Sequence, residues 1–66
     1  MSIGFSIKAW EKLTHGDVII AALGEEEIIG KVDGAPTATE VFILDRSGMP
    51  VVLVKTEGWD IRLRKL

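Results

Sequence analysis

Short apolar runs separated by turn residues constrain this chain more than any other feature. The runs are rich in Val and Ile, and a turn signal containing Gly, Pro or Asp recurs about every 8–12 residues. This spacing is typical of the short strands in all-β barrels and sandwiches. We therefore predict an all-β fold whose strands cover residues 18–23, 27–33, 39–45, 50–55 and 59–63.

The length of the chain narrows the choice of architecture. Its 66 residues leave room for a single domain, residues 1–66, in which residues 17–65 supply the strands. Free strand edges template aggregation, and closing the strands into a bent barrel removes those edges. Gly30, in the middle of the second predicted strand, is a position where such a sheet could bend sharply. A small five-stranded barrel is therefore the predicted architecture.

An N-terminal arm, residues 1–14, precedes the predicted barrel. Phe5 and Ile7 alternate with small or polar neighbours, which is strand spacing. From there the apolar positions change to a helical spacing at Ile7, Trp10 and Leu13. The pattern predicts a short extended segment followed by one helical turn.

Four segments occur in a distinctive order along the chain. A Gly-Asp pair within residues 14–19 leads into the first predicted strand, and Gly-Lys-Val at residues 30–32 lies within the second. Residues 45–48 join two further strands, and Trp59 opens the last one. Over residues 14–65 this order resembles small SH3-like β-barrel proteins of bacteria and phages. The resemblance implies a barrel but leaves the function open, because SH3-like folds host peptide binders, nucleic-acid binders, ribosomal modules and virion parts.

The third and fourth predicted strands are apolar on both faces. In a half-exposed strand one face should be polar, yet Phe42 and Leu44 alternate with further apolar residues. One face fills the barrel, and the other either lies under the N-terminal arm or meets another protein. The arm itself could cross to a neighbouring subunit. We predict a non-enzymatic interaction or assembly module, either homo-oligomeric or part of a larger bacterial or phage complex. The predicted protein interface comprises Trp10, Phe42, Leu44, Val51 and Leu53.

The charge balance makes nucleic-acid binding the second choice. The formal net charge is −2, whereas general nucleic-acid binders carry an excess of basic residues that neutralise phosphates. Basic residues do gather near the end of the sequence, where they could line one exposed strand. The alternative function is therefore a nucleic-acid-associated module that uses Lys55, Arg62, Arg64 and Lys65.

Catalytic and metal chemistry find little support in the sequence. The chain has no Cys and a single His, so disulfides are impossible and zinc ligands are scarce. His15 and Asp17 lie close together, but no nucleophile is recognisably grouped with them. The three glutamates at residues 25–27 are interpreted as a solvated hairpin tip rather than a calcium loop. We expect no enzyme activity, cofactor or metal, and keep a ligand or catalytic site between subunits as a third possibility.

The sequence also predicts where the protein resides. Its beginning lacks the basic and apolar regions of a signal peptide. The longest apolar run, residues 18–23, is much shorter than the roughly 20 residues of a membrane-spanning helix. We expect a soluble, cytoplasmic protein without a membrane partner, or a virion-associated one if it comes from a phage.

Overall fold

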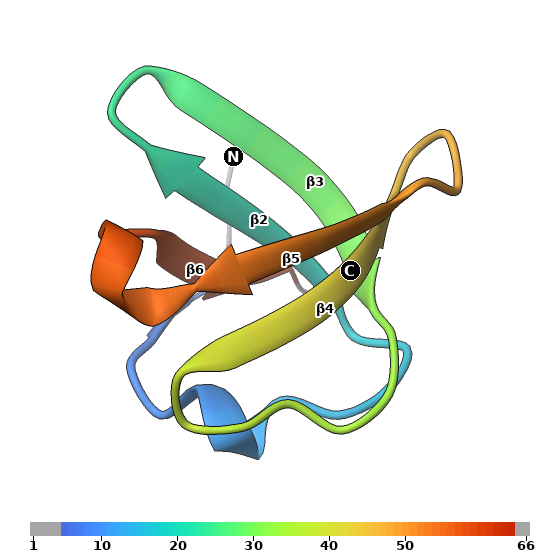
Figure 1. Ribbon diagram of the computed structural model, residues 1–66, viewed down its shortest axis with the longest axis horizontal. Helices are drawn as coiled ribbons and strands as arrows, with labels where there is room; N and C mark the ends of the chain where they lie inside the picture. Colours follow the sequence, from blue (N-terminus) through green and yellow to red (C-terminus); the bar gives the residue numbers. More distant parts are fainter. Residues whose placement is uncertain (1–4, 65–66) are drawn as a thin grey trace.

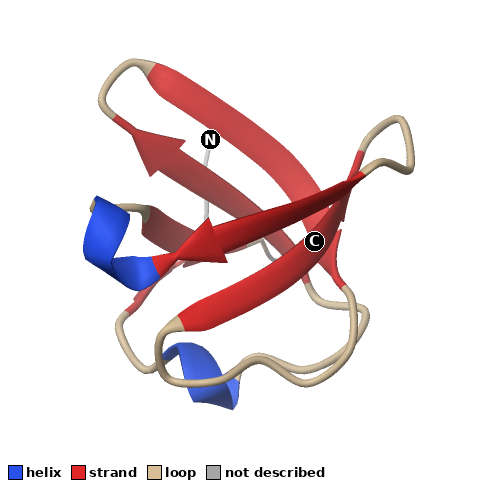
Figure 2. Cartoon of the chain, viewed as in Figure 1, coloured by secondary structure: helices blue, strands red, loops and turns tan. Residues whose placement is uncertain are grey.

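One antiparallel sheet of six strands forms the body of the molecule, in the order β1-β6-β2-β3-β4-β5 (Figure 1). The structure is a computed structural model, and it describes residues 5–64. Two short 3-10 turns accompany the strands, η1 (Trp10–Lys12) before β2 and η2 (Lys55–Glu57) between β5 and β6 (Figure 2). The strands are β1 (Phe5–Ile7), β2 (Val18–Leu23), β3 (Glu26–Val32), β4 (Glu40–Asp45), β5 (Pro50–Val54) and β6 (Asp60–Leu63).

The all-β prediction is confirmed, and the bounds of β2 to β6 lie within one residue of the predicted ranges. The predicted number of five strands is wrong, because part of the N-terminal arm joins the sheet as β1. There Phe5 pairs with Leu63 and Ile7 with Ile61. The helical turn predicted after this segment is present as η1. The sheet bends around one core, but β1 and β5 remain its two edges and it does not close.

The core lies on the inner face of the bent sheet. Alternate residues of the strands point into it, as the two-residue period of a strand requires. The arm contributes as well, since η1 and the residue after it bury Trp10 and Leu13 in the same cluster. The arm therefore fills the inside of the sheet instead of covering its outer apolar face. The buried residues are Trp10, Leu13, Ile19, Ala21, Val32, Val41, Ile43, Leu53 and Ile61.

Gly30 lets β3 and β4 approach each other closely. A Cβ atom at this position would lie 2.6 Å from the carbonyl oxygen of Leu44 and 3.0 Å from Cδ1 of Ile43. Backbone oxygens cannot move aside as a flexible side chain does, so any larger residue pushes the two strands apart. The glycine predicted to permit a bend therefore sits where only a hydrogen atom fits.

Lys55 connects elements from the two ends of the sheet. It follows β5, one edge strand, and its ammonium group donates a hydrogen bond to the carbonyl oxygen of Lys8, directly after the other edge strand β1. The same ammonium group lies over the indole ring of Trp10, 5.6 Å from the ring centroid. A single exposed side chain thus bridges the gap that the hydrogen-bonded ladders leave open.

Replacing Lys55 with methionine tests this bridge. The variant keeps an unbranched apolar side chain but loses the hydrogen bond and the cation–π contact, so we expect the free energy of unfolding to fall by about 1 kcal/mol. For a domain of this size that loss corresponds to a melting temperature lower by roughly 4–8 °C. Lys12→Met, on the exposed surface of η1, is the matched control. Equal thermal shifts for both variants would contradict the bridge.

Candidate functional site: the outer face of the sheet

The pairing of β4 with β5 sorts the predicted interface residues onto two faces. Phe42 pairs with Val52, whereas Val41 pairs with Leu53. Directly paired residues share a face, so Leu53 shares the inner face with Val41. Leu53 is fully buried, and Val51 packs against the core. The sequence analysis placed five residues in one interface. The structure instead separates Leu53, Val51 and the buried Trp10 from Phe42 and Leu44.

Four large apolar side chains are exposed on and beside the outer face of β4 and β5. The relative exposures are 48% for Phe42, 37% for Leu44, 60% for Met49 and 47% for Val52. Val52 and Met49 were missed from the sequence. The signal for Val52 was its position in the hairpin, since the residue opposite Phe42 must share its face. We call Phe42, Leu44 and Val52 the outer apolar face, whereas Met49 is exposed at the turn that joins the two strands.

A tight turn joins β4 to β5 and contains Met49. The carboxylate of Asp45 accepts hydrogen bonds from the backbone N–H groups of Ser47 and Met49, at 2.8 Å and 3.0 Å. The N–H of Gly48 also donates to the carbonyl oxygen of Asp45. This is the turn that an Asp at the first position and a Gly at the fourth predict.

The free edge of the sheet adjoins the outer apolar face. At the ends of the β4–β5 ladder, Asp45 N–H bonds to the Met49 carbonyl and Lys55 N–H bonds to the Thr39 carbonyl. Because bonded and non-bonded pairs alternate in an antiparallel ladder, the backbone groups of Val52 and Val54 point away from β4. Within the described residues, β5 has no second neighbouring strand. Its edge therefore offers backbone donors and acceptors beside the apolar side chains.

Three of the four basic residues predicted to contact nucleic acid lie within the described residues, and these three do not form one patch. Lys55 is bound to the Lys8 carbonyl and lies over Trp10. Arg62 lies 3.4 Å from the carboxylate of Asp60, measured from Nε to Oδ2. Lys65 lies outside the described residues. Arg64 alone joins other cationic side chains, and these come from different parts of the chain.

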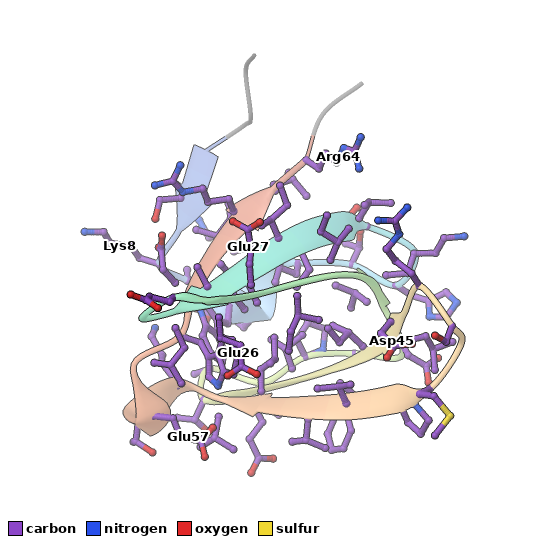
Figure 3. The ribbon with its side chains drawn as sticks, turned by 90° about the horizontal axis from the view of Figure 1, so that it is seen from above. Lys8, Glu26, Glu27, Asp45, Glu57 and Arg64 are labelled. Carbon is purple, nitrogen blue, oxygen red and sulfur yellow. The ribbon has the colours of Figure 1, made fainter. Side chains whose placement is uncertain are left out.

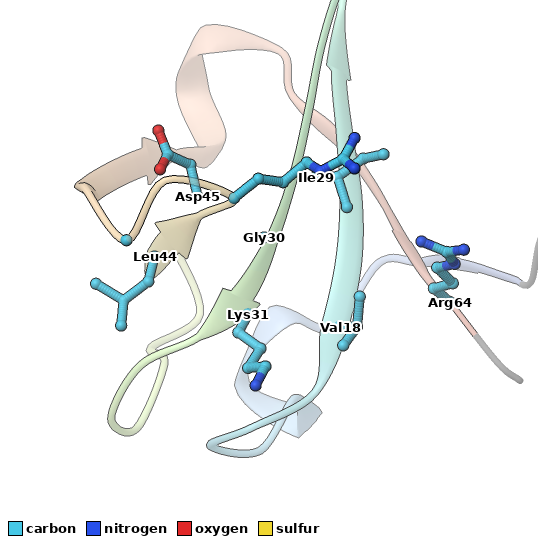
Figure 4. A pocket seen from close by; sticks show the side chains of 9 residues that line it. Val18, Ile29, Gly30, Lys31, Leu44, Asp45 and Arg64 are labelled. Carbon is cyan, nitrogen blue, oxygen red and sulfur yellow. The ribbon is translucent and has the colours of Figure 1, made fainter.

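An open pocket of about 450 Å³ lies where β2, β3 and the β4–β5 turn meet (Figure 4). Strand pairing sets Val18 beside Lys31, and Lys31 beside Leu44. The N–H of Arg64 donates to the Val18 carbonyl, which adds Arg64 to the same row. Apolar and cationic side chains thus meet in one hollow. We call it the basic pocket, and the side chains that matter here are Val18, Ile29, Lys31, Leu44, Arg46 and Arg64.

His15 takes part in loop structure. Its Nδ1 accepts a hydrogen bond from the N–H of Gly34 at 2.9 Å, so that nitrogen carries no proton in this arrangement. The 3.8 Å approach of Asp33 Oδ1 to the same nitrogen is therefore not a hydrogen bond. Asp17 accepts a bond from the N–H of Thr14. Over residues 5–64 there is no group of three His, Cys, Asp or Glu side chains placed to hold a metal ion.

Comparisons with protein-family models, with characterised proteins and with solved structures found no match to this chain. Of the helical segments between residues 5 and 64, none is long and apolar enough to cross a membrane. The arguments about function therefore rest on the outer apolar face, the free edge of β5 and the basic pocket.

Proposed function

We propose that this chain is a non-enzymatic protein–protein interaction module that acts in assembly through the outer apolar face. The observation that carries the proposal is the grouping of Phe42, Leu44 and Val52 on one face, each exposed by more than a third of its surface. Single exposed apolar residues are ordinary, but contiguous ones mark contact surfaces. The occupant proposed first is a second copy of the chain, and a component of a larger complex would use the same surface.

The free edge of β5 supports the same role. A partner strand that adds to this edge satisfies the outward backbone groups of Val52 and Val54, and its side chains reach the neighbouring apolar face. Pro50 begins the strand and has no N–H to offer, so it restricts where such a strand can pair. Edge pairing and apolar contact would therefore act together on one side of the sheet.

The fold proposed for this role is the SH3-like barrel. Support comes from the continuous antiparallel run β6-β2-β3-β4-β5, which contains the strands predicted from the sequence. The bend of this run around the buried core is also consistent with a small barrel, to which β1 is an addition at the edge.

A Phe42→Glu substitution tests the contact surface. A carboxylate buried in an apolar contact loses its hydration without gaining a partner, so we expect the dissociation constant for self-association to rise at least about tenfold. Phe42 is 48% exposed, and the isolated fold should therefore accept the change. The measurement is molar mass by light scattering after size exclusion, over a wide range of concentration.

Ala38→Glu is the matched control, because it adds the same charge at an exposed position in the loop before β4. It should associate like the wild type. The proposal of self-association fails if the wild-type chain stays monomeric at every concentration, or if Phe42→Glu and Ala38→Glu behave alike.

A further inference from the structure

The basic pocket carries positive charge that its own surroundings leave unbalanced. Lys31 comes from β3, Arg46 from the β4–β5 turn and Arg64 from the segment after β6. The ion pair found among residues 5–64 joins Arg62 to Asp60, and it does not involve these three cations. Like charges held together without a partner attract an anionic group to the site.

Asp45 also lines the pocket, but it does not neutralise these charges. One of its carboxylate oxygens accepts the backbone hydrogen bonds of the turn. In the close view, its side chain points away from Lys31 and Arg64, which lie on either side of Val18 (Figure 4). The pocket therefore presents cationic groups around an aliphatic centre.

The aliphatic centre favours a polypeptide over nucleic acid as the occupant. Val18, Ile29 and Leu44 supply the apolar part of the lining, and the described residues that line the pocket include no aromatic ring on which a base could stack. The net charge of −2 also opposes the approach of a polyanion. The fitting occupant is a narrow polypeptide segment that combines carboxylates with aliphatic side chains.

The chain itself carries a segment with the carboxylates of such an occupant. Glu25, Glu26 and Glu27 are all exposed at the turn between β2 and β3, whereas Ile28, which follows them, packs against the chain's own core. Figure 1 shows this turn and the β4–β5 turn projecting on opposite sides of the molecule. Viewed from above, Glu26 and Glu27 likewise lie apart from Arg64 (Figure 3). A chain cannot reach its own pocket with this turn, but a second copy can.

We infer that the basic pocket receives the acidic β2–β3 turn of a second copy of this chain. The contact joins two different surfaces, so it is head-to-tail and repeats into a ring or an open filament. This inference rests on the assembly function proposed above and names a partner surface for it. Leu44 belongs to both the pocket and the outer apolar face, so the two contacts adjoin.

Reciprocal charge reversal tests the contact. The turn variant carries Glu25→Lys and Glu26→Lys, and the pocket variant carries Arg46→Glu and Arg64→Glu. All four residues are exposed, so both variants should fold, which circular dichroism and thermal melting check. Each variant alone sets like charges against each other, and we expect its dissociation constant for self-association to rise at least about tenfold. An equimolar mixture restores opposite charges and should regain the wild-type molar mass.

A charge-matched control separates this contact from a general effect of net charge. Glu11→Lys with Glu40→Lys gives the same net charge as the turn variant but alters exposed residues elsewhere. This control keeps both the acidic turn and the basic pocket, so it should associate by itself like the wild type. Loss of association in the control equal to that in the turn variant, or wild-type association of the turn or pocket variant, would overturn the inference.

The outcomes also distinguish this inference from the proposed function. If Phe42→Glu disrupts assembly but the charge variants do not, the outer apolar face stands and the head-to-tail contact is wrong. If only the charge variants disrupt assembly, the pocket contact stands and the outer apolar face is not the interface. A monomeric wild type that binds a single-stranded oligonucleotide through Arg46 and Arg64 overturns the inference and assigns the pocket to phosphates.

Discussion

A Gly30→Ala variant is expected to lose about 3 kcal/mol of unfolding free energy, because the added methyl group overpacks the β3–β4 contact. Its Cβ would lie 2.6 Å from the Leu44 carbonyl oxygen, which belongs to the backbone of β4. Small domains have a total stability of about 0.05–0.15 kcal/mol per residue, so this loss is a large part of what the chain has. Urea titration followed by circular dichroism measures it.

Gly34→Ala is the comparison that isolates the steric effect. Gly34 has a φ of +84°, and a Cβ there would meet nothing within 4 Å. Its replacement should therefore cost only the strain of a left-handed backbone, about 1–2 kcal/mol. Two results would contradict the steric explanation. One is a Gly30→Ala variant that unfolds at the same urea concentration as the wild type, and the other is a Gly30→Ala variant that is more stable than Gly34→Ala.

Trp10→Ala is expected to lose about 3–5 kcal/mol, the usual cost of deleting a fully buried large aromatic side chain. Trp10 is 1% exposed and belongs to the core cluster, although it comes from a turn of three residues. The substitution leaves a cavity where the arm enters the core and also removes the ring beneath the Lys55 ammonium group. Even at low temperature we expect part of the Trp10→Ala population to be unfolded, and circular dichroism measures that fraction.

Trp59→Ala provides the matched comparison for this variant. Trp59 is half-buried, and its indole N–H donates to the carboxylate of Glu57 at 3.0 Å. The Trp59→Ala substitution should lower the unfolding free energy by less than half as much as Trp10→Ala, because a partly exposed ring leaves a smaller cavity. Equal losses for the two tryptophans would mean that the arm does not plug the core.

The strands could be predicted from the sequence because their signals are local. Runs of Val and Ile between Gly, Pro and Asp turns define β2 to β6 almost to the residue. The alternation of Phe5 and Ile7 predicts an extended segment, but the joining of this segment to the sheet as β1 could not be found in this way. It has three residues, and its partner Leu63 lies at the other end of the chain from Phe5. Only the tertiary fold supplies the free edge of β6 with which it pairs.

For a similar physical reason, the sequence could not show that the predicted interface residues lie on two different faces of the sheet. Both faces of β5 are apolar, so hydrophobic periodicity cannot tell whether Val52 or Leu53 points inward. The hairpin register decides, and it places Val52 opposite Phe42 and Leu53 opposite the buried Val41. Considering each strand separately loses that information, whereas counting back from the Asp45–Gly48 turn would have retained it.

The basic pocket was not predictable by inspecting neighbours in sequence. Lys31, Arg46 and Arg64 are spread over half of the chain and meet only because β3, β4 and β6 belong to one bent sheet. Lys55 and Arg64, in contrast, lie in the locally basic end of the sequence. The fold uses Lys55 in a surface contact within the molecule, where its ammonium group bonds to the Lys8 carbonyl.

In the sheet, β6 lies between β1 and β2, although it is the last strand to be synthesised. Until residue 63 has left the ribosome, β1 has no strand to pair with and one edge of β2 stays uncovered. The hairpins β2–β3 and β4–β5 can form early because their strands are neighbours in sequence, but the complete sheet must wait until β6 has been synthesised. A nascent chain of this protein therefore exposes apolar strand edges until β6 emerges.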